Sequence, residues 1–303
     1  MTVVSNLQRV LEEHRFAVTA EIGPPKGASA QSIVEKAQIL KGYADAFNIT
    51  DNQTAVVRQS SMAGCRLLLD CSMEPILQVT CRDRNRIALQ SDVLGASALG
   101  IHNVLCVTGD HQSFGNHPQA KGVYDIDSIQ MLYMFQQMRD QGIFQNGEPI
   151  TKGNPVLFLG AACNPFAEPK QYRLARLEKK IHAGAQFIQT QSIFNIDYFC
   201  SWMDEVCSSG LHNKVFILAG VTPLKSVKMM QRMKYHVPGV DVPEKIEQRM
   251  VHASDPLAEG YAIALETIQD LKQVNGLSGV HITALFWESI IPKLVTDAGL
   301  YPR

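Results

Sequence analysis

Two carboxylates in this chain each follow an apolar run, at the point where a strand would give way to a loop. Glu21 follows Phe16–Ala20 and precedes a double proline, which ends the strand sharply. Asp110 follows the apolar run Val104–Val107. In parallel α/β folds, catalytic side chains gather at the carboxyl ends of the strands. The two acids therefore predict one active site built by a closed barrel, and a chance pairing of capping residues is the alternative.

Apolar segments with strand character alternate with amphipathic segments along the whole chain. Strands are expected at residues 16–22, 44–50, 75–80, 103–107, 156–161, 186–190, 214–219 and 280–285. Helices are expected at 29–41, 57–71, 84–99, 127–141, 169–184, 196–208, 224–235 and 288–298, with an extra helix at 243–275 before the last strand. Eight strand–helix pairs predict an α/β fold, a single (β/α)8 TIM barrel over residues 1–303. An open doubly wound sheet is the alternative, although no G-x-G-x-x-G follows a strand.

The bulk composition argues against several classes of partner. The chain is 46% hydrophobic and carries 28 basic and 29 acidic residues, so its net charge of −1 predicts no nucleic acid or membrane partner. No apolar run approaches the roughly 20 residues of a membrane span, and the N-terminus lacks a signal-peptide core, so we expect a cytoplasmic protein. The seven cysteines include no C-x-x-C pair, which disfavours a metal or iron–sulfur centre made by this chain alone.

The predicted strand ends carry polar but mostly uncharged side chains. They include Asn48, Thr50, Asp51, Gln78, Thr80, Thr108, Asn164, Gln189, Gln191 and Thr222. Uncharged donors and acceptors suit heterocycles with mixed edges, such as flavins and pterins, whereas ordinary turn formation is the alternative. On the fifth helix Arg173, Arg176 and Lys180 share one face. This basic face either holds a cofactor phosphate or is a solvated surface balanced by Glu178.

Four motifs together resemble methylenetetrahydrofolate reductase, over nearly the whole chain and in the right order. They are Ala20–Pro25, Thr108–Asp110, Lys179–Ala185 and Gln189–Gln191. The segments TCRDRN at 80–85 and ACNPF at 162–166 are similar to the catalytic subunit of the anaerobe and acetogen branch. The resemblance implies a single flavin-binding TIM-barrel domain that reduces 5,10-methylenetetrahydrofolate to 5-methyltetrahydrofolate by hydride transfer from N5 of the reduced flavin.

The same resemblance implies roles for individual residues. Glu21 is expected to be the general acid that protonates the substrate, which requires surroundings that raise its pKa. Asp110 is expected to act beside the flavin and to bind the pterin, and Gln191 to contact the folate. Flavin contacts are expected from Thr50, Gln78, Thr108, Gly109, Asp110, Tyr124, Ala162, Asn164, Arg176 and Lys180. No metal ligand is expected.

Several positions depart from the family pattern. Gln78, Thr108 and Cys163 stand where histidine, arginine and tyrosine are common, and Arg173 and Arg176 replace acidic and amide positions. These positions touch the phosphate and adenosine side of the cofactor. FAD is the family default, and the departures make FMN an alternative. Met233 and Trp287 stand where the NADH-dependent form has a phenylalanine and an arginine, which puts NADH as donor in doubt.

Three other functions are compatible with the sequence. Anaerobe-type relatives often pair with an iron–sulfur/zinc subunit, so one alternative is an oligomeric, flavin-binding barrel subunit that takes electrons from such a partner and is inactive with NADH alone. A flavin-dependent proline dehydrogenase and a flavin-free pterin methyltransferase are the others.

Overall fold

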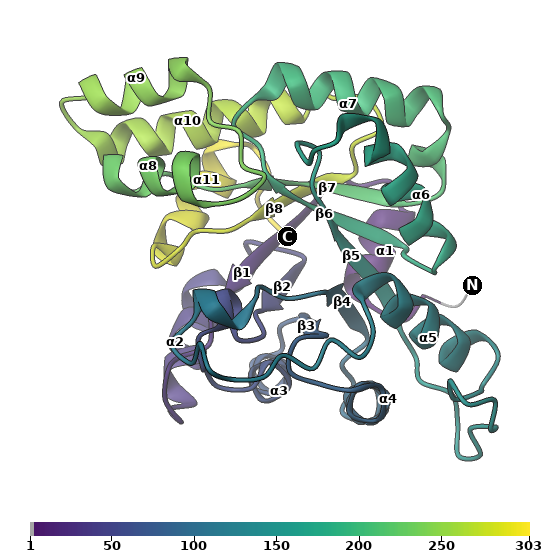
Figure 1. Cartoon of the computed structure of the whole chain (residues 1–303). Coiled ribbons are helices and arrows are strands. Elements are labelled where there is room, and N and C mark those ends of the chain that lie inside the picture. Colours follow the sequence, from purple (N-terminus) through teal and green to yellow (C-terminus); the bar gives the residue numbers. More distant parts are fainter. Residues whose placement is uncertain (1–2) are drawn as a thin grey trace.

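Eight parallel strands close into a barrel in the computed structural model, which describes residues 3–303 (Figure 1). The strands are β1 (Ala17–Ile22), β2 (Ala46–Ile49), β3 (Pro75–Thr80), β4 (Asn103–Val107), β5 (Phe158–Cys163), β6 (Phe187–Ser192), β7 (Phe216–Val221) and β8 (Gly279–Ile282). Each pairs with the next, and β8 pairs with β1, so the predicted TIM barrel is confirmed. Within residues 3–303, no helix combines the length and apolar character needed to cross a bilayer.

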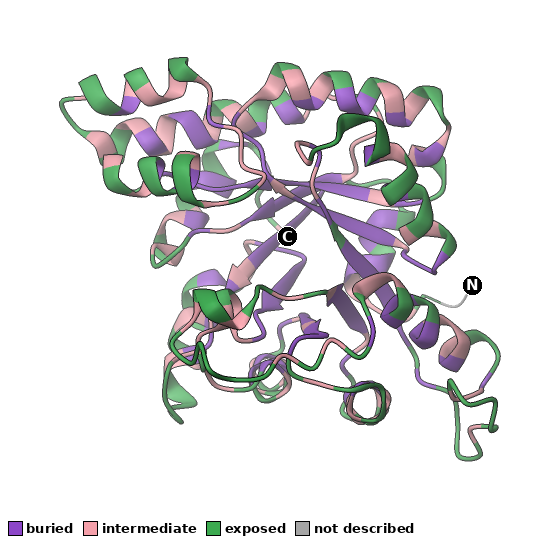
Figure 2. Cartoon of the chain, in the orientation of Figure 1, coloured by how far each residue is buried: buried purple, intermediate pink, exposed green. Residues whose placement is uncertain are grey.

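One helix follows each strand and covers the outside of the barrel, where Figure 2 shows buried inner and exposed outer faces. These helices are α2 (Gln31–Leu40), α3 (Ser61–Asp70), α4 (Arg86–Ala98), α5 (Ser128–Asp140), α6 (Arg173–His182), α7 (Ile196–Ser208), α8 (Val227–His236) and α11 (Ile291–Asp297). Side-chain caps fix several starts: Asp127, the residue before α5, forms a capping box with Gln130.

The extra helix expected at 243–275 is two helices, α9 (Glu244–His252) and α10 (Pro256–Leu271). Pro256 lacks the N–H that would continue α9, and it suits the first turn of α10. Asp255 caps that turn by accepting hydrogen bonds from the N–H groups of Leu257 (3.0 Å) and Ala258 (3.1 Å). The single-helix prediction was therefore wrong at Ala253–Asp255.

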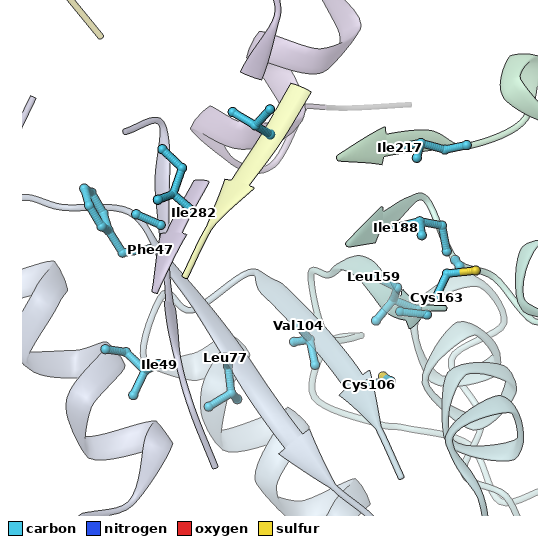
Figure 3. Close-up of a cluster of buried hydrophobic side chains, with 14 of the residues drawn as sticks. Phe47, Ile49, Leu77, Val104, Cys106, Leu159, Cys163, Ile188, Ile217 and Ile282 are labelled. Atoms are coloured by element: carbon cyan, nitrogen blue, oxygen red, sulfur yellow. The ribbon is translucent and has the colours of Figure 1, made fainter. Parts of the chain in front are cut away.

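The main hydrophobic core lies between the strands and the surrounding helices. Outward-facing strand residues such as Ile49, Leu77, Val104, Leu159 and Ile217 are at most 1% exposed (Figure 3). Period-2 alternation sends their neighbours into the barrel interior. The sequence of each strand therefore specifies both the core and the lining of the barrel.

A short helix that the sequence analysis did not predict, α1 (Asn6–Glu12), closes the N-terminal end of the barrel. Its Leu7, Val10 and Leu11 are at most 1% exposed. They join a second cluster made of inward-facing residues, namely Ala17, Ala46, Ile76, Leu105, Phe158, Phe187 and Leu218. This end of the barrel is therefore a packed apolar plug.

A buried polar layer crosses the barrel interior above this plug. Gln189 Nε2 donates to Asn48 Oδ1 (3.0 Å) and to Thr19 Oγ1 (3.1 Å), while Asn48 Nδ2 donates to Gln189 Oε1 (2.7 Å). Thr19 Oγ1 lies 3.0 Å from His281 Nδ1, and burial lowers the pKa of His281 to about 4, so this ring is neutral. The layer forms a hydrogen-bonded floor, and residues two positions further along each strand face the open mouth.

Candidate active site

Glu21 faces the barrel mouth from the carboxyl end of β1, one layer above Thr19. Its side chain is half-buried. Burial raises the pKa of this carboxyl from 4.5 to about 7, and the negative charge of Glu288 adds to the rise. A hydrogen bond with Gln78 and the positive charges of Lys36 and Arg58 act in the opposite direction. The carboxyl is therefore poised to hold or release a proton near neutral pH.

Lys36 and Glu288 form an ion pair beside Glu21, with 2.5 Å between Lys36 Nζ and Glu288 Oε1. Lys36 comes from α2, and Glu288 begins the short helix η5 (Glu288–Ile290) after β8. Lys36 Nζ also donates to the carbonyl of Gly23 (3.2 Å). The sequence analysis did not identify these two residues or Arg58, because each is an isolated charge far from Glu21 along the chain.

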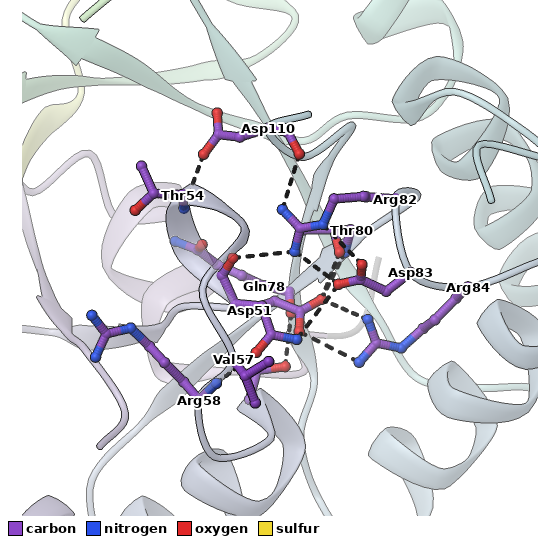
Figure 4. Close-up of polar contacts among 12 residues, drawn as sticks. Asp51, Thr54, Val57, Arg58, Gln78, Thr80, Arg82, Asp83, Arg84 and Asp110 are labelled. Carbon is purple, nitrogen blue, oxygen red and sulfur yellow. Dashed lines mark hydrogen bonds and ion pairs between the residues drawn. The ribbon is translucent and has the colours of Figure 1, made fainter. Parts of the chain in front are cut away.

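Polar side chains from β2 and β3 continue the mouth. Thr50, at the end of β2, is buried and donates to Gln53. Thr80 donates its backbone N–H and its hydroxyl to Asp51 Oδ2, each over 3.0 Å. Arg84 Nη1 donates to the same oxygen (2.6 Å), as Figure 4 shows. Asp51 thus ties the ends of β2 and β3 together and is fully engaged in this structural role.

Asp110 lies exposed after β4 and is held by the loops that follow β2 and β3 (Figure 4) and by Tyr124 of its own loop. Its Oδ2 accepts the backbone N–H of Thr54 (3.0 Å), and its carbonyl accepts Arg82 Nη1 (3.1 Å) and Tyr124 Oη (3.2 Å). Thr54 has a left-handed φ of 55°, and its neighbour Ala55 has the same value. Backbone strain in non-glycine residues is typical of functional sites. Here the hydrogen bond to Asp110 helps to hold Thr54 in the strained conformation.

The backbone at position 109, just before Asp110, requires glycine. Its φ is +91°, and an added Cβ would lie 3.1 Å from Thr80 Cβ and 3.2 Å from Arg82 Cβ. Thr108, exposed beside it, donates to Ser128 Oγ (3.1 Å). The turn after β4 therefore keeps its backbone close to Thr80, at the end of β3.

The end of β5 carries a small exposed residue with basic side chains beside it. Ala162 is exposed on an otherwise buried strand, and Lys180 of α6 donates to its carbonyl. Lys180 and the exposed Arg176 both lower the pKa of neighbouring Cys163, although burial raises that pKa more strongly. Two members of the predicted basic face thus lie beside the mouth.

Arg173, the third predicted member of the basic face, is not available there. It is 4% exposed and donates to the Ala167 carbonyl and to Tyr198, and it pairs with Glu168 (3.0 Å). Its guanidinium lies 4.9 Å from the centre of the Tyr198 ring. Arg173 fastens the β5–α6 loop to α7, and the expectation of one shared basic face is wrong for this residue.

The remaining predicted site residues lie around the same mouth. Gln191 is half-buried near the end of β6, where its side chain accepts the backbone N–H of Ser192 (3.2 Å). Asn164 follows β5, and its side chain accepts the backbone N–H of Phe166 (2.9 Å). A Cβ on Gly239, in the α8–α9 loop, would come within 1.7 Å of Asn164 Nδ2. That loop therefore packs directly on the β5 end of the mouth.

The mouth as a whole combines one carboxyl of near-neutral pKa, many uncharged hydrogen-bonding groups and a basic edge at β5. This arrangement suits protonation of a polar heterocyclic substrate next to a bound planar cofactor. Among residues 3–303, no group of three or more histidine, cysteine, aspartate or glutamate side chains is arranged to hold a metal ion.

Comparison with known proteins gives a consistent family match. A family model for methylenetetrahydrofolate reductase matches residues 6–299. Methylenetetrahydrofolate reductase (NADH) 1 of Arabidopsis thaliana is 23% identical over 308 residues, covering 99% of this chain and 48% of the relative. Methylenetetrahydrofolate reductase 1 of Schizosaccharomyces pombe is 19% identical over 239 residues, covering 76% of this chain and 36% of the relative. The chain thus spans half or less of the length of these relatives.

A solved structure shares the fold. An uncharacterized protein from Clostridium thermocellum that binds two copies of 5-methyl-5,6,7,8-tetrahydrofolic acid matches with a TM-score of 0.65 and 16% identity. The match covers 97% of this chain and 98% of that chain.

Proposed function

The chain belongs to the methylenetetrahydrofolate reductase family, and on that premise we propose that its barrel reduces 5,10-methylenetetrahydrofolate to 5-methyltetrahydrofolate with Glu21 as the general acid. The observation that carries the proposal is the raised pKa of Glu21, about 7, at the barrel mouth. The similarly folded Clostridium thermocellum protein binds methyltetrahydrofolate, which is the product expected here.

Glu21 would donate its proton to the bridging nitrogen N10 of the substrate. Protonation there opens the five-membered ring and leaves an iminium at N5, whose exocyclic carbon is ready to accept a hydride. A carboxyl at its ordinary pKa of 4.5 would be almost fully ionised at neutral pH, whereas one near 7 is protonated about half of the time. Desolvation at the mouth thus supplies the acid that the ring opening needs.

The polar groups of the mouth are of the type that suits a flavin. Ala162 is exposed at the end of β5, and its small side chain leaves open surface there. The residues that we assign to the flavin are Thr50, Gln78, Thr108, Gly109, Asp110, Tyr124, Ala162 and Asn164, with Arg176 and Lys180 on the phosphate side. A flavin bound there would supply the hydride. FAD is the family default for this flavin, and FMN is the alternative.

Asp110 and Gln191 would orient the pterin. Asp110 offers a carboxylate to the amino group of the pterin ring, and Gln191 offers an amide that can both donate and accept. The negative charge of Asp110 would also disfavour further negative charge on a neighbouring cofactor, and so tune its potential.

A second candidate is a barrel subunit that receives electrons from an iron–sulfur partner and is inactive with NADH alone. Met233 favours it, because this residue is only 6% exposed and packs in a cluster with Leu224, Met230, Val242, Met250 and Ile263. A side chain buried in this way does not offer a surface on which a nicotinamide could stack.

Glu21→Gln tests the proposed role directly. We expect the variant to retain its flavin absorbance and to accept electrons as the wild type does, while reoxidation of the reduced flavin by methylenetetrahydrofolate slows by roughly 10²–10⁴-fold. Stopped-flow absorbance under anaerobic conditions separates the two half-reactions. Glu35→Gln, an exposed change on α2, serves as the matched control and should leave both rates unaltered.

Two outcomes would count against the proposal. If Glu21→Gln slowed the reduction of the flavin as strongly as its reoxidation by the folate, Glu21 would not be a dedicated proton donor. If the purified chain were colourless and could not be reconstituted with flavin, the reductase function itself would be lost and a flavin-free pterin methyltransferase would be favoured.

A further inference from the structure

A single buried guanidinium joins the loops that follow β2, β3 and β4. Arg82 lies two residues beyond the end of β3 and is 2% exposed. Its Nη1 donates to the carbonyl of Asp110 (3.1 Å), and its Nη2 donates to the carbonyl of Asn52 (3.1 Å). Nε and Nη2 also form a fork with the carboxylate of Asp83, over 2.8 and 2.7 Å (Figure 4). The side chain therefore contacts one segment from each of the three loops.

Both the main chain and the carboxylate of Asp110 depend on these contacts. The main chain is held directly, because Arg82 Nη1 and Tyr124 Oη donate to the same carbonyl. The carboxylate is held indirectly, because Oδ2 accepts the N–H of Thr54. Arg82 Nη2 fixes the loop of Thr54 two residues earlier, at Asn52. Since Asn52 and Thr54 have left-handed φ values of 45° and 55°, this loop keeps its shape only while neighbouring groups hold it.

These contacts leave one carboxylate oxygen of Asp110 for a ligand. Among residues 3–303, a hydrogen bond to this carboxylate comes from Thr54 and engages Oδ2, so Oδ1 remains free to accept another. The side chain is exposed at the mouth, where a ligand can reach it. The direction of Oδ1 is set by the two points at which Asp110 is held, and Arg82 contributes to both.

Stability alone does not account for a charged side chain at position 82. Burial of an ion pair removes both charges from water, and an apolar pair of similar volume is often at least as stable. The best-attested role of such a pair is to fix how the segments that it joins are aligned. The segments that Arg82 joins are the ones that hold Asp110.

We propose that Arg82 is a positioning residue for the folate step, which sets where Asp110 Oδ1 meets the amino group of the pterin. This role rests on the proposed function, and in particular on the pterin contact assigned to Asp110. Arg82 touches neither the substrate nor the cofactor in this role and acts only through Asp110. A change at Arg82 should therefore weaken folate binding no further once the carboxylate of Asp110 has been removed.

A double-mutant cycle between Arg82 and Asp110 tests this role in the flavin-loaded protein. Equilibrium titration with 5-methyltetrahydrofolate, followed by the flavin absorbance, gives the affinities without turnover. We expect Asp110→Asn to weaken binding by roughly 10–100-fold and Arg82→Lys by roughly 5–50-fold. Lysine keeps the charge, but its single nitrogen cannot replace the planar fork that reaches three loops at once. The double variant should bind the folate as Asp110→Asn alone does.

The midpoint potential of the flavin is the second readout. Arg82→Lys conserves the net charge, so a change in the potential would report a movement of Asp110. We expect the potential to rise in Arg82→Lys, as in Asp110→Asn, because a negative charge is displaced from the flavin in both. The double variant should show no further rise.

Arg84→Lys is the matched control in the same loop. Arg84 pairs with Asp51 (2.6 Å) and Asp92 (2.8 Å), which lie outside the turn after β4. Any loss of affinity that Arg84→Lys causes should therefore add to the loss in Asp110→Asn.

Two results would overturn the proposal. Additive losses from Arg82→Lys and Asp110→Asn would mean that Arg82 acts independently of Asp110, and unchanged affinity in Arg82→Lys would mean that it positions nothing. If Arg82→Lys is unstable, Asp83→Asn gives the same comparison, because it weakens the fork with Arg82 at an exposed residue. A wild-type protein that does not bind 5-methyltetrahydrofolate would instead overturn the proposed function.

Discussion

At the scale of single residues, the proton affinity of Glu21 is set by opposing influences of which burial is the largest. Removal of water raises the pKa, and Glu288 raises it further, against the hydrogen bond from Gln78 and the charges of Lys36 and Arg58. The ion pair between Lys36 and Glu288 places one charge of each sign beside the carboxyl. Each of the two can therefore be removed to shift the pKa of Glu21 in a known direction.

The pH dependence of the folate half-reaction should follow the protonated form of Glu21. An acid catalyst is active below its pKa, so we expect the rate to fall as pH rises through about 7. Glu288→Gln removes a negative charge and should move this fall to lower pH, whereas Lys36→Met removes a positive charge and should move it to higher pH. Each shift should be a few tenths of a unit to about one unit.

Single-turnover reoxidation of the reduced protein by methylenetetrahydrofolate, measured from about pH 5.5 to 9, gives these profiles. Shifts of the same sign in both variants would contradict the electrostatic explanation, because loss of either partner would then act only through packing. A profile that rises with pH in the wild type would contradict the assignment of Glu21 as the acid.

Part of this site is readable from the sequence. Glu21 and Asp110 are identifiable because each follows an apolar run, and the need for a raised pKa at Glu21 follows from its chemistry. Arg58, Lys36 and Glu288 carry no such signal, because their proximity to Glu21 depends on how three separate loops and helices meet. Helical spacing places Arg173 with Arg176 and Lys180, but it does not reveal that the β5–α6 loop and Tyr198 cover the Arg173 side chain.

At the scale of elements, the alternation of strands and helices was enough to predict the barrel. The boundaries of β5, β6 and β7 lie two residues beyond the predicted strand ends, at Cys163, Ser192 and Val221. The last residues of these strands include small or polar side chains that face the mouth, so they look like loop residues although their backbones belong to the ladder. Helix α1 was not predicted because its seven residues gain stability only from the barrel end that they cover.

Leu11→Ala tests whether α1 is part of the barrel core. Leu11 is 1% exposed and packs in the apolar plug, so we expect the variant to lose about 2–5 kcal/mol in the free energy of unfolding. Arg9→Ala on the same helix removes an exposed side chain and should stay within about 0.5 kcal/mol of the wild type. Urea unfolding followed by circular dichroism measures both, and equal values would mean that α1 is not packed as described.

At the scale of the whole molecule, the barrel interior is layered from an apolar plug, through a hydrogen-bonded polar floor, to an open polar mouth. The floor brings together Thr19, Asn48, Gln189 and the neutral His281 from four strands. Because each of these groups has a partner, the floor can carry a polar ligand above it without exposing unsatisfied groups. The chain builds this mouth within half or less of the length of its curated relatives.

The source of electrons is a property of the whole molecule and its partners, and it separates the two candidate functions. Met233 is a buried residue of α8, and Trp287 stands where the family pattern has an arginine, so neither offers the expected contact to a nicotinamide. We therefore expect NADH to leave the flavin of the purified chain oxidised, while dithionite bleaches it and methylenetetrahydrofolate then restores its absorbance. Anaerobic titration in one cuvette, with an equal concentration of free flavin as the control, gives all three results.

Bleaching by NADH would establish a self-sufficient reductase and remove the need for an electron-transferring partner. Failure of the folate to restore the absorbance after dithionite would contradict both candidates.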